Sequence, residues 1–532
     1  MKKFLALFLA LVLCLGVLAG CGGDTNTDET KGQSGGDVSI DSVTAPLYED
    51  SDEVVIEMWC PSNTDLEMEG SWLDVAVEKT INATINIHEY ESRDQYEILI
   101  AEQKIPALTY ANAKIHGPIY GPMGAYIDWN EYIDDMPNVK RVLEQYPNLV
   151  AESTELDGSM YQLPVALSGS AAIYGWLYRQ DIFEKHDLEF PTNQEEFYNV
   201  LVELKELYPS SYPFVLRSMS GNMGGLNSFA NVWNADVSMW GTTNTCMDFD
   251  PETETYYCGH TSEARKECIA FLSKLYKEGL LHPSCLTIDT SGWIESLASN
   301  TSFITFDKVD RIPQLTNGAI DANPEYVLSG ASCFPMGTYG DGTTSEINGG
   351  GWWLVSALID DEHLEQILTY IDWLYSPEGI EVTSWGIEGE SFELDAEGNK
   401  QFLEVFADIG SDHTGEGYTG SGLGVNGYNG YCDFNGFLAS VDDNVVDALH
   451  NIGLTATDGN DPILSYNDEE QDIWDTYYQA FFDKALSYAQ AFIMGEKDIE
   501  ADWDEYIAAL EALHMEELLE IHQAAYDRIY GE

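Results

Sequence analysis

A run of alternating elements beginning near residue 54 limits the folds that are open to this chain. The segment 54–59 (VVIEMW) is an almost continuous apolar run, which is typical of a buried strand. Residues 72–79 then carry apolar side chains at helical spacing, and residues 83–87 alternate between apolar and polar. Residues 92–102 have the pattern of a second helix. This β-α-β-α order predicts a mixed α/β sheet covered by helices.

The length of the chain adds a second constraint. A single hydrophobic core seldom extends beyond ~250–300 residues, and this chain has 532. We therefore expect at least two cores.

The first 20 residues have the pattern of an export signal. Lys2 and Lys3 precede an apolar run over residues 4–18, which small residues follow. A transmembrane anchor is the alternative, but the run is shorter than the ~20 residues that a helix needs to span a bilayer. Residues 1–20 are therefore predicted to be a signal peptide.

The end of this segment also predicts a lipid anchor. Residues 18–21 (LAGC) resemble the bacterial lipobox, in which the cysteine is acylated and becomes the first residue of the mature protein. Residues 21–50 are rich in Gly, Asp, Thr and Ser, which is typical of a flexible tether. We therefore expect a protein held by lipid on Cys21 at the extracellular face of the cell membrane of a Gram-positive bacterium.

The charge of the chain narrows the classes of partner. It has 92 acidic residues against 23 basic ones, so its formal net charge is −69. Such a surface repels phosphate backbones, which argues against nucleic-acid binding, and it disfavours polyanionic ligands. A neutral or weakly charged ligand is therefore predicted.

The nine cysteines do not indicate a disulfide framework. Without Cys14 and Cys21 seven remain, an odd number, and the sequence has no CxxC motif. Cys246 and Cys258 flank a turn-rich stretch and would face each other across a hairpin. A bridge between these two and a pair of free buried thiols both remain open.

Later segments of the chain are mainly helical. Gly495 is placed to end one of the predicted helices, and Ser376 followed by Pro377 has the pattern of an N-cap and first helical residue. The helices predicted from apolar spacing cover residues 364–374, 474–494, 503–510 and 515–526.

The segment 410–436 differs from both of its neighbours. Nine of its 27 residues are glycine, mixed with Asn, Asp and Tyr, which argues against regular helix or strand. A long polar loop in a compact protein is usually functional or disordered. We favour a loop that borders a ligand cleft.

Several short motifs follow one another over nearly 500 residues. They are DGSMYQLP (157–164), LYRQDIF (177–183), PTNQEEF (191–197), LYKEGL (275–280), SFIT (302–305), WLYSPEG (373–379), WGIEG (385–389) and AYDR (525–528). In this order they resemble the extracellular solute-binding lipoproteins of carbohydrate ABC importers. The family is the family 1 solute-binding proteins, in their Gram-positive oligosaccharide-binding branch.

The resemblance implies a fold and a division of the chain. The fold is α/β, with two lobes as in periplasmic binding proteins (type II-like), a hinge between the lobes and a ligand cleft. The divisions expected are an N-lobe (51–168), a C-lobe (169–340), a return to the N-lobe after a hinge crossing (341–410), a Gly-rich cleft loop (411–436) and C-terminal helices mainly on the C-lobe (437–532).

Aromatic and polar residues at expected strand ends, crossings and glycines are the candidates for ligand contact. Sugar rings stack their apolar C–H faces on aromatic planes, and carboxylates and amides bind sugar hydroxyls. For each aromatic residue a place in the core is the alternative, and for the Asp307 and Arg311 pair it is a structural salt bridge. The candidates are Trp59, Asn63, Tyr110, Asn112, Trp176, Tyr178, Asp307, Arg311, Trp352, Trp353, Trp385 and Glu388.

No catalytic or metal-binding segment is recognisable in the sequence. It has no HExxH, GxSxG or GxxxxGK[ST] motif, and Thr253 stands where a calcium loop beginning at Asp248 would need glycine. We therefore predict a monomeric protein without enzyme activity, cofactor or metal, which captures an oligosaccharide and delivers it to ABC transporter permease subunits. A secreted glycan-degrading enzyme and a surface glycan-adhesion protein are the alternatives.

Overall fold

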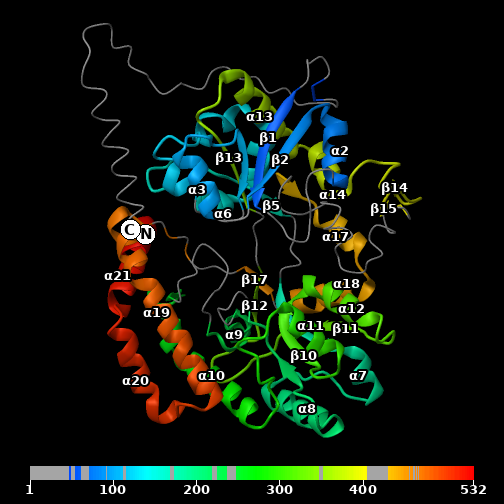
Figure 1. The fold of residues 1–532 in the computed structure, drawn as a ribbon, viewed down its shortest axis with the longest axis vertical. Helices are drawn as coiled ribbons and strands as arrows, with labels where there is room; N and C mark the ends of the chain where they lie inside the picture. The colour runs from blue at the N-terminus through cyan, green and yellow to red at the C-terminus, as the bar shows by residue number, and fades with distance from the viewer. Residues whose placement is uncertain are drawn as a thin grey trace.

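The computed structural model describes residues 47–48, 54–61, 71–90, 93–111, 116–167, 173–218, 224–235, 247–346, 351–403, 429–454, 456–458, 462, 464 and 466–531. Two α/β bodies make up this part of the chain, one above the other in Figure 1. We call N-lobe the body built on the five-stranded sheet β2-β1-β3-β13-β4, and C-lobe the body built on the four-stranded sheet β11-β6-β10-β7.

The opening of the N-lobe confirms the predicted β-α-β-α order. Its elements are β1 (Val55–Pro61), α2 (Trp72–Ile81), β2 (Thr84–Tyr90) and α3 (Arg93–Ala101). Strands β2 and β3 (Leu108–Ala111) both pair with β1 in parallel. Strand β13 (Trp352–Val355) then pairs antiparallel with β3 and with β4 (Leu163–Pro164). A strand from residue 352 therefore completes a sheet that the first part of the chain begins.

Helices cover both faces of the N-lobe sheet. The buried residues of α2, α5 (Pro137–Gln145), α13 (Asp361–Leu374) and α14 (Pro377–Trp385) share one apolar cluster with one face, and α3 packs on the other. The predicted cap of α14 is confirmed, because Ser376 Oγ accepts a hydrogen bond from the backbone N–H of Gly379 at 3.0 Å. This cap satisfies an N–H group that the helix itself leaves unpaired.

Strand β6 (Tyr174–Arg179) lies inside the C-lobe sheet, between β11 and β10. Strand β10 (Ile304–Lys308) pairs antiparallel with β6, and β7 (Phe214–Val215) pairs parallel with β10. Strand β11 (Leu328–Ala331) pairs antiparallel with β6 on its other side. One face packs on the helices α8 (Gln194–Leu207), α9 (Gly224–Ala230) and α10 (Glu263–Lys277). The other packs on α11 (Thr290–Ala298), α12 (Ile312–Ile320) and α18 (Asp443–Gly453).

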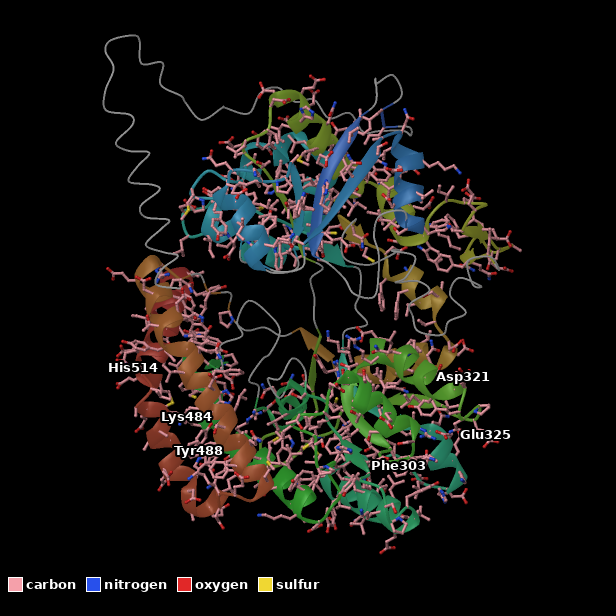
Figure 2. All side chains as sticks on the ribbon, viewed as in Figure 1. Phe303, Asp321, Glu325, Lys484, Tyr488 and His514 are labelled. Atoms are coloured by element: carbon pink, nitrogen blue, oxygen red, sulfur yellow. The ribbon has the colours of Figure 1, made fainter. Side chains whose placement is uncertain are left out.

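Three long helices at the end of the chain lie along one side of the C-lobe, in orange and red in Figure 1. They are α19 (Asp468–Met494), α20 (Ile499–Glu511) and α21 (Met515–Tyr530). Gly495 has a φ of 75° and ends α19, as predicted. His514, which Figure 2 labels, stacks on Tyr477 of α19 with ring centroids 3.7 Å apart and so ties α21 to α19.

Among the described elements, the chain passes between the two lobes three times. It leaves the N-lobe sheet after β4 and enters the C-lobe sheet at β6, and it returns between β11 and β13. The third passage follows α17 (Phe434–Ser440), which contacts α14, and precedes α18, which packs on β11. Within the described ranges, no helix combines the length and the apolar character needed to cross a membrane.

The last residues of the Gly-rich segment are more regular than expected. Residues 431–432 form strand β16 (Tyr431–Cys432), which pairs with β5 (Ala166–Leu167), and α17 begins at Phe434. The prediction that 410–436 contains no helix or strand is therefore wrong at this end. Asp433 supplies the missing local signal, because its carboxylate caps α17 by accepting from the N–H of Asn435 at 3.1 Å. Residues 410–428 lie outside the described part.

The remaining elements are short. They are α4 (His116–Tyr120), α6 (Pro147–Ser153), α7 (Gln180–Lys185), β8 (Met247–Asp250), β9 (Thr255–Cys258), β12 (Thr344–Glu346), β14 (Phe392–Leu394), β15 (Lys400–Phe402), β17 (Ala456–Asp458) and the 3-10 helices η1 (Trp129–Glu131), η2 (Ile133–Asp135), η3 (Asn231–Trp233), η4 (Gly259–Thr261) and η5 (Val309–Arg311).

Candidate functional site

The N-lobe sheet presents the carboxyl ends of its three parallel strands on the side of the C-lobe (Figure 1). In open α/β sheets this edge is the usual place of ligand sites, because loops and strand ends leave polar groups there. Trp59 lies near the end of β1, Ala111 is the last residue of β3, and Trp352 is the first residue of the antiparallel β13. Two of the predicted tryptophans therefore lie at this edge.

Strand register places Trp59 and Trp352 on the same face of the sheet. Trp59 pairs with Thr109 of β3, and Trp352 pairs with Ala111, two residues further along the same strand. Because side chains two residues apart share a face, both rings project from one side of the sheet, with β3 between them. Both are half-buried, and Trp59 stacks on His88 with ring centroids 5.2 Å apart.

The neighbouring candidates Tyr110 and Trp353 project into the opposite face, which is core. Both are buried, with their rings edge to face at 5.3 Å. Gly351 has a φ of 116°, and a Cβ there would lie 2.3 Å from the Tyr110 hydroxyl oxygen. The group that approaches this glycine closely is therefore a side chain of the N-lobe itself.

The C-lobe presents an edge of different chemistry toward the N-lobe. Strands β7, β10 and β11 all run so that they end on the side at which β6 begins. Asp307, near the end of β10, is fully buried and pairs with Arg217, which follows β7. The guanidinium binds both carboxylate oxygens, with Nε 2.5 Å from Oδ2 and Nη2 2.9 Å from Oδ1.

The expected pairing of Asp307 with Arg311 is therefore wrong. Arg311 is half-buried at the end of η5, where its Nε lies 3.5 Å from Asp310 Oδ1 and its Nη1 donates to Gln314 Oε1 at 3.2 Å. The physical reason is strand order: β7 lies directly beside β10, so Arg217 approaches Asp307 from the neighbouring strand. A separation of four residues in sequence does not provide that geometry.

Arg217 is the polar residue of this edge that sequence reasoning missed. Burial disfavours its charged form, but the adjacent charge of Asp307 outweighs that effect, so the pKa of Arg217 is raised. The guanidinium also lies 5.1 Å from the centre of the Trp293 ring. Its signal in the sequence is faint: a short apolar run over 213–216 ends at an arginine, as a buried strand with a polar end does.

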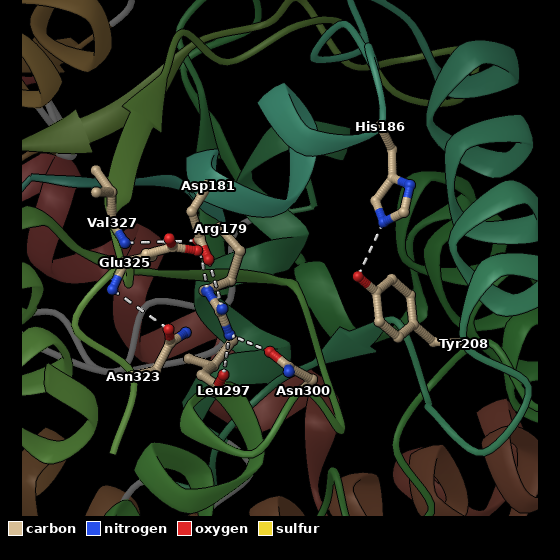
Figure 3. A network of polar contacts seen from close by, with 9 residues as sticks. All are labelled: Arg179, Asp181, His186, Tyr208, Leu297, Asn300, Asn323, Glu325 and Val327. Carbon is tan, nitrogen blue, oxygen red and sulfur yellow. Dashed lines mark hydrogen bonds and ion pairs between the residues drawn. The ribbon is translucent and has the colours of Figure 1, made fainter. Parts of the chain in front are cut away.

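A second buried arginine, Arg179, lies at the far end of β6 and is structural (Figure 3). Its Nε and Nη2 donate to the two oxygens of Asp181 at 2.8 and 2.7 Å. Its Nη1 donates to Leu297 O and Asn300 Oδ1, both at 2.7 Å, and its guanidinium lies 4.2 Å from the centre of the Tyr326 ring. The nitrogen atoms of the Arg179 guanidinium therefore bind groups of the C-lobe itself.

The candidates Trp176 and Tyr178 both belong to β6 and lie among aromatic side chains. Trp176 is fully buried and lies parallel to Phe334, with ring centroids 5.2 Å apart. Tyr178 is half-buried and packs on Phe190 at 4.5 Å, at the end of β6 farther from the N-lobe. Trp176 is thus a core residue, and Tyr178 lies away from the edge that faces the N-lobe.

Trp385 and Glu388 lie in the N-lobe at the end of α14. The Trp385 ring is buried against Phe402, its Nε1–H donates to Asp433 Oδ2 at 2.9 Å, and Lys400 Nζ lies 5.5 Å from its centre. Glu388 is exposed in the turn that follows. Trp385 thus connects α14 to the start of α17.

Some predicted residues lie outside the described part of the chain: Asn63, Asn112, Cys21 and Cys246. Cys258 is a buried free thiol in the hairpin of β8 and β9, where Met247 is its cross-strand partner. Residues 248–250 belong to β8, and the predicted turn covers residues 251–254, where Asp250 accepts from the N–H of Glu252 at 2.9 Å. Within the described residues, no group of His, Cys, Asp and Glu side chains is arranged to hold a metal ion.

Comparisons with known proteins support the predicted resemblance. No family model matches the chain. Lipoprotein LipO of Bacillus subtilis is 21% identical over 412 residues, which cover 74% of this chain and 74% of LipO. The fructooligosaccharide ABC transporter substrate-binding protein FusA of Streptococcus pneumoniae is 24% identical over 432 residues, which cover 75% of this chain and 74% of FusA.

The fold also matches a solved structure. The alginate-binding protein AlgQ2 superposes with a TM-score of 0.71 at 20% identity, over 90% of this chain and 99% of that one. The predicted two-lobed α/β fold of solute-binding proteins is thus confirmed, and so is the resemblance to carbohydrate ABC-transporter substrate-binding proteins.

Proposed function

We propose that this chain is the solute-binding component of an ABC importer and that it captures an oligosaccharide between its two lobes. One observation carries the proposal: the N-lobe edge with the half-buried Trp59 and Trp352 and the C-lobe edge with Arg217 and Asp307 lie on the facing sides of the two sheets. The similarity to FusA, which is named for a fructooligosaccharide, supports this ligand class.

Each edge would contribute a different interaction to a bound sugar. The apolar C–H face of a sugar ring packs on the face of a tryptophan, while its hydroxyls need hydrogen-bond partners. Arg217 is held in place by the bidentate contact with Asp307, so it can donate to a hydroxyl without losing much conformational freedom. Stacking from one lobe and hydrogen bonding from the other would make binding depend on both.

Such a division implies that the lobes close on the ligand. Three passages of the chain connect the two lobes, and a hinge of this kind lets two rigid bodies approach each other. Small-angle scattering with and without saturating ligand should show a smaller radius of gyration in its presence. An unchanged curve from a protein that is open when empty would contradict closure.

We further propose that the ligand is neutral or weakly charged. The chain has a net charge of −69, and the buried Arg179 and Arg217 are each compensated by an aspartate. A polyanion would therefore meet long-range repulsion, and these two arginines would not be free to neutralise it.

A lipid anchor on Cys21 completes the proposed arrangement, because a binding protein delivers its ligand to the permease at the membrane surface. LipO is itself named a lipoprotein. Two acyl chains hold a protein stably at a membrane, whereas one does so only marginally. The Cys21→Ser variant should appear in the medium or remain unprocessed. A processed Cys21→Ser protein that still fractionates with membranes would disprove the anchor.

Thermal unfolding against a panel of oligosaccharides tests the function directly. A ligand that binds only the folded state stabilises it by ~2.7 kcal/mol at a concentration 100 times its Kd. The panel should include fructo-oligosaccharides, other neutral oligosaccharides and oligouronates, with reducing-sugar release measured in parallel. Stabilisation by a neutral oligosaccharide without release supports the proposal. Release of reducing ends would indicate an enzyme, and binding to insoluble glycan alone would indicate an adhesin.

A further inference from the structure

Arg265 differs from the other two buried arginines of the C-lobe. It is the third residue of α10, and its side chain is 0% exposed. Arg179 and Arg217 each bind an aspartate with two hydrogen bonds. No described carboxylate forms an ion pair with Arg265, whose Nη2 donates to the amide oxygen of Asn227 at 2.7 Å.

Several N–H groups around this contact have no acceptor within the described part of the chain. They are Nε and Nη1 of Arg265 and Nδ2 of Asn227, and all of them are shielded from solvent. Asn227 is 1% exposed and lies on α9, which packs beside α10 in the C-lobe core. The side chains of Arg265 and Asn227 are therefore buried next to each other with more N–H donors than nearby acceptors.

The acidic residues nearest in sequence do not supply the missing charge. Glu263 is exposed, and Glu267 accepts a hydrogen bond from the N–H of Thr338 at 2.7 Å. His260, fully buried just before α10, has a pKa well below its ordinary value because of its burial and the charge of Arg265. It is therefore neutral near pH 7 and adds no positive charge of its own.

An isolated charge in a protein interior is costly because it loses its hydration without gaining a partner. Native proteins avoid this cost by pairing the charge or by binding an ion. Arg265 also lies in the first turn of a 15-residue helix, where the macrodipole adds positive potential. Both the donors and the field at this position suit a small anion.

We propose that Arg265 and Asn227 bind a compact monovalent anion, such as chloride, inside the C-lobe. The absence of exposed surface on Arg265 favours a free ion over the carboxylate of a transported sugar, which would have to remain attached to a large polar ligand. The site lies in the C-lobe core, beside the helix α9 that contacts the edge residue Arg217.

The position of the site suggests what the anion does. Asn227 belongs to α9, and the N–H of Gly225 in the same helix donates to Arg217 O at 3.0 Å. An anion that holds α9 against α10 therefore also supports the segment that carries Arg217. This is a structural role: the ion completes the buried charge balance and fixes one helix at the edge of the C-lobe.

Thermal unfolding in sodium chloride and in sodium gluconate at equal ionic strength tests the proposal. Gluconate is too large for the buried position, so the two salts separate specific binding from screening. Chloride should raise the melting temperature of the wild type above that in gluconate by about 1–3 °C, increasing with concentration. Crystals grown with bromide should show an anomalous peak within hydrogen-bond distance of Arg265.

Two variants make the result specific. Asn227→Asp places a carboxylate beside the guanidinium, so its stability should be high in both salts and independent of chloride. Arg528→Gln removes an arginine that pairs with Glu470 elsewhere on the C-lobe and should keep the chloride dependence of the wild type. Equal behaviour of wild type and Asn227→Asp toward chloride, or no bromide peak, would overturn the proposal. Stabilisation by glucuronate but not by chloride would overturn it too, because the site would then serve a sugar carboxylate.

Discussion

The two lobes use the same sheet architecture but bury different chemistry at the edges that face each other. In the N-lobe, the edge carries the half-buried rings of Trp59 and Trp352. Both faces of the sheet are packed with apolar residues. In the C-lobe, the edge carries the buried pair of Arg217 and Asp307. In the proposed function, the N-lobe would contribute contact area to a bound sugar and the C-lobe would contribute directed hydrogen bonds.

The lobes also differ in what surrounds their central strands. Around Trp176 of β6, one face of the C-lobe sheet is packed with phenylalanine rings. The opposite face shares a continuous apolar cluster with the N-lobe, in which Leu177 of β6 and Met58 of β1 are both members. Because one apolar cluster joins the two sheets, we expect the two lobes to unfold together.

The largest expected effect concerns the charged edge of the C-lobe. Asp307→Ala leaves Arg217 buried without its partner, which should lower the free energy of unfolding by about 3–5 kcal/mol. The Arg217→Leu/Asp307→Leu double variant removes both charges and should recover most of that loss. Urea unfolding measures both.

Ligand binding by the double variant then sharpens the comparison between the lobes. If the charged pair contributes hydrogen bonds to the sugar, the refolded double variant will bind weakly although it is stable. If calorimetry shows that the double variant binds as tightly as the wild type, the Arg217–Asp307 pair stabilises the C-lobe but does not bind the sugar.

A pH effect is expected from the C-lobe helices. His522 is buried, donates from Nδ1 to Leu518 O at 2.6 Å and accepts at Nε2 from the Tyr466 hydroxyl at 2.8 Å. Burial lowers its pKa from 6.5 to about 4. As pH falls from 6.5 toward 4, the unfolded chain binds a proton that the folded protein does not, so stability should fall by up to about 3 kcal/mol.

In the N-lobe the corresponding effect has the opposite sign. Burial raises the pKa of Asp372, despite its hydrogen bonds from Asn138 and Val139. Its contribution to stability therefore increases as pH falls. Unfolding curves from pH 7 to 4 should be flatter for His522→Gln than for the wild type. Curves of identical slope would contradict the neutral state assigned to His522.

The aromatic edge of the N-lobe should affect binding more than stability. Trp59→Ala or Trp352→Ala should weaken oligosaccharide binding by about 1–3 kcal/mol, because each removes a stacking surface. Trp59→Phe and Trp352→Phe keep an aromatic plane and are the matched controls, for which most of the affinity should remain. If calorimetry shows no difference in affinity between the Ala and Phe variants, the sugar does not stack on these two rings.

The smallest effect tests whether the lobes unfold together. Ser376→Ala in the N-lobe and Ser262→Ala in the C-lobe each remove the side-chain cap of a helix, α14 and α10. Each should cost ~1 kcal/mol. Because the apolar cluster joins the lobes, both variants should shift a single unfolding transition by a similar amount. Calorimetric scans in which each variant shifts a different transition would show two independent units.

Much of the local structure could be predicted because its causes are local. The spacing of apolar residues predicted β1, α2, β2, α3 and α13, and single residues such as Ser376 and Gly495 marked helix ends. The end of the Gly-rich segment was mispredicted, because the cap of α17 by Asp433 and the pairing of β16 with β5 outweigh its composition.

By itself, then, the sequence determined the first strands and helices, several of the later helices, the expectation of at least two cores and the resemblance to solute-binding proteins. Only the tertiary structure decided which aromatic residues are core and which lie at an edge. Trp352 and Trp353 are adjacent in sequence, yet the first is half-buried at the edge and the second is fully buried. Strand alternation sends neighbours to opposite faces, and which face is covered depends on helices distant in sequence. For the same reason Asp307 pairs with Arg217, 90 residues away, because strand pairing brings them together.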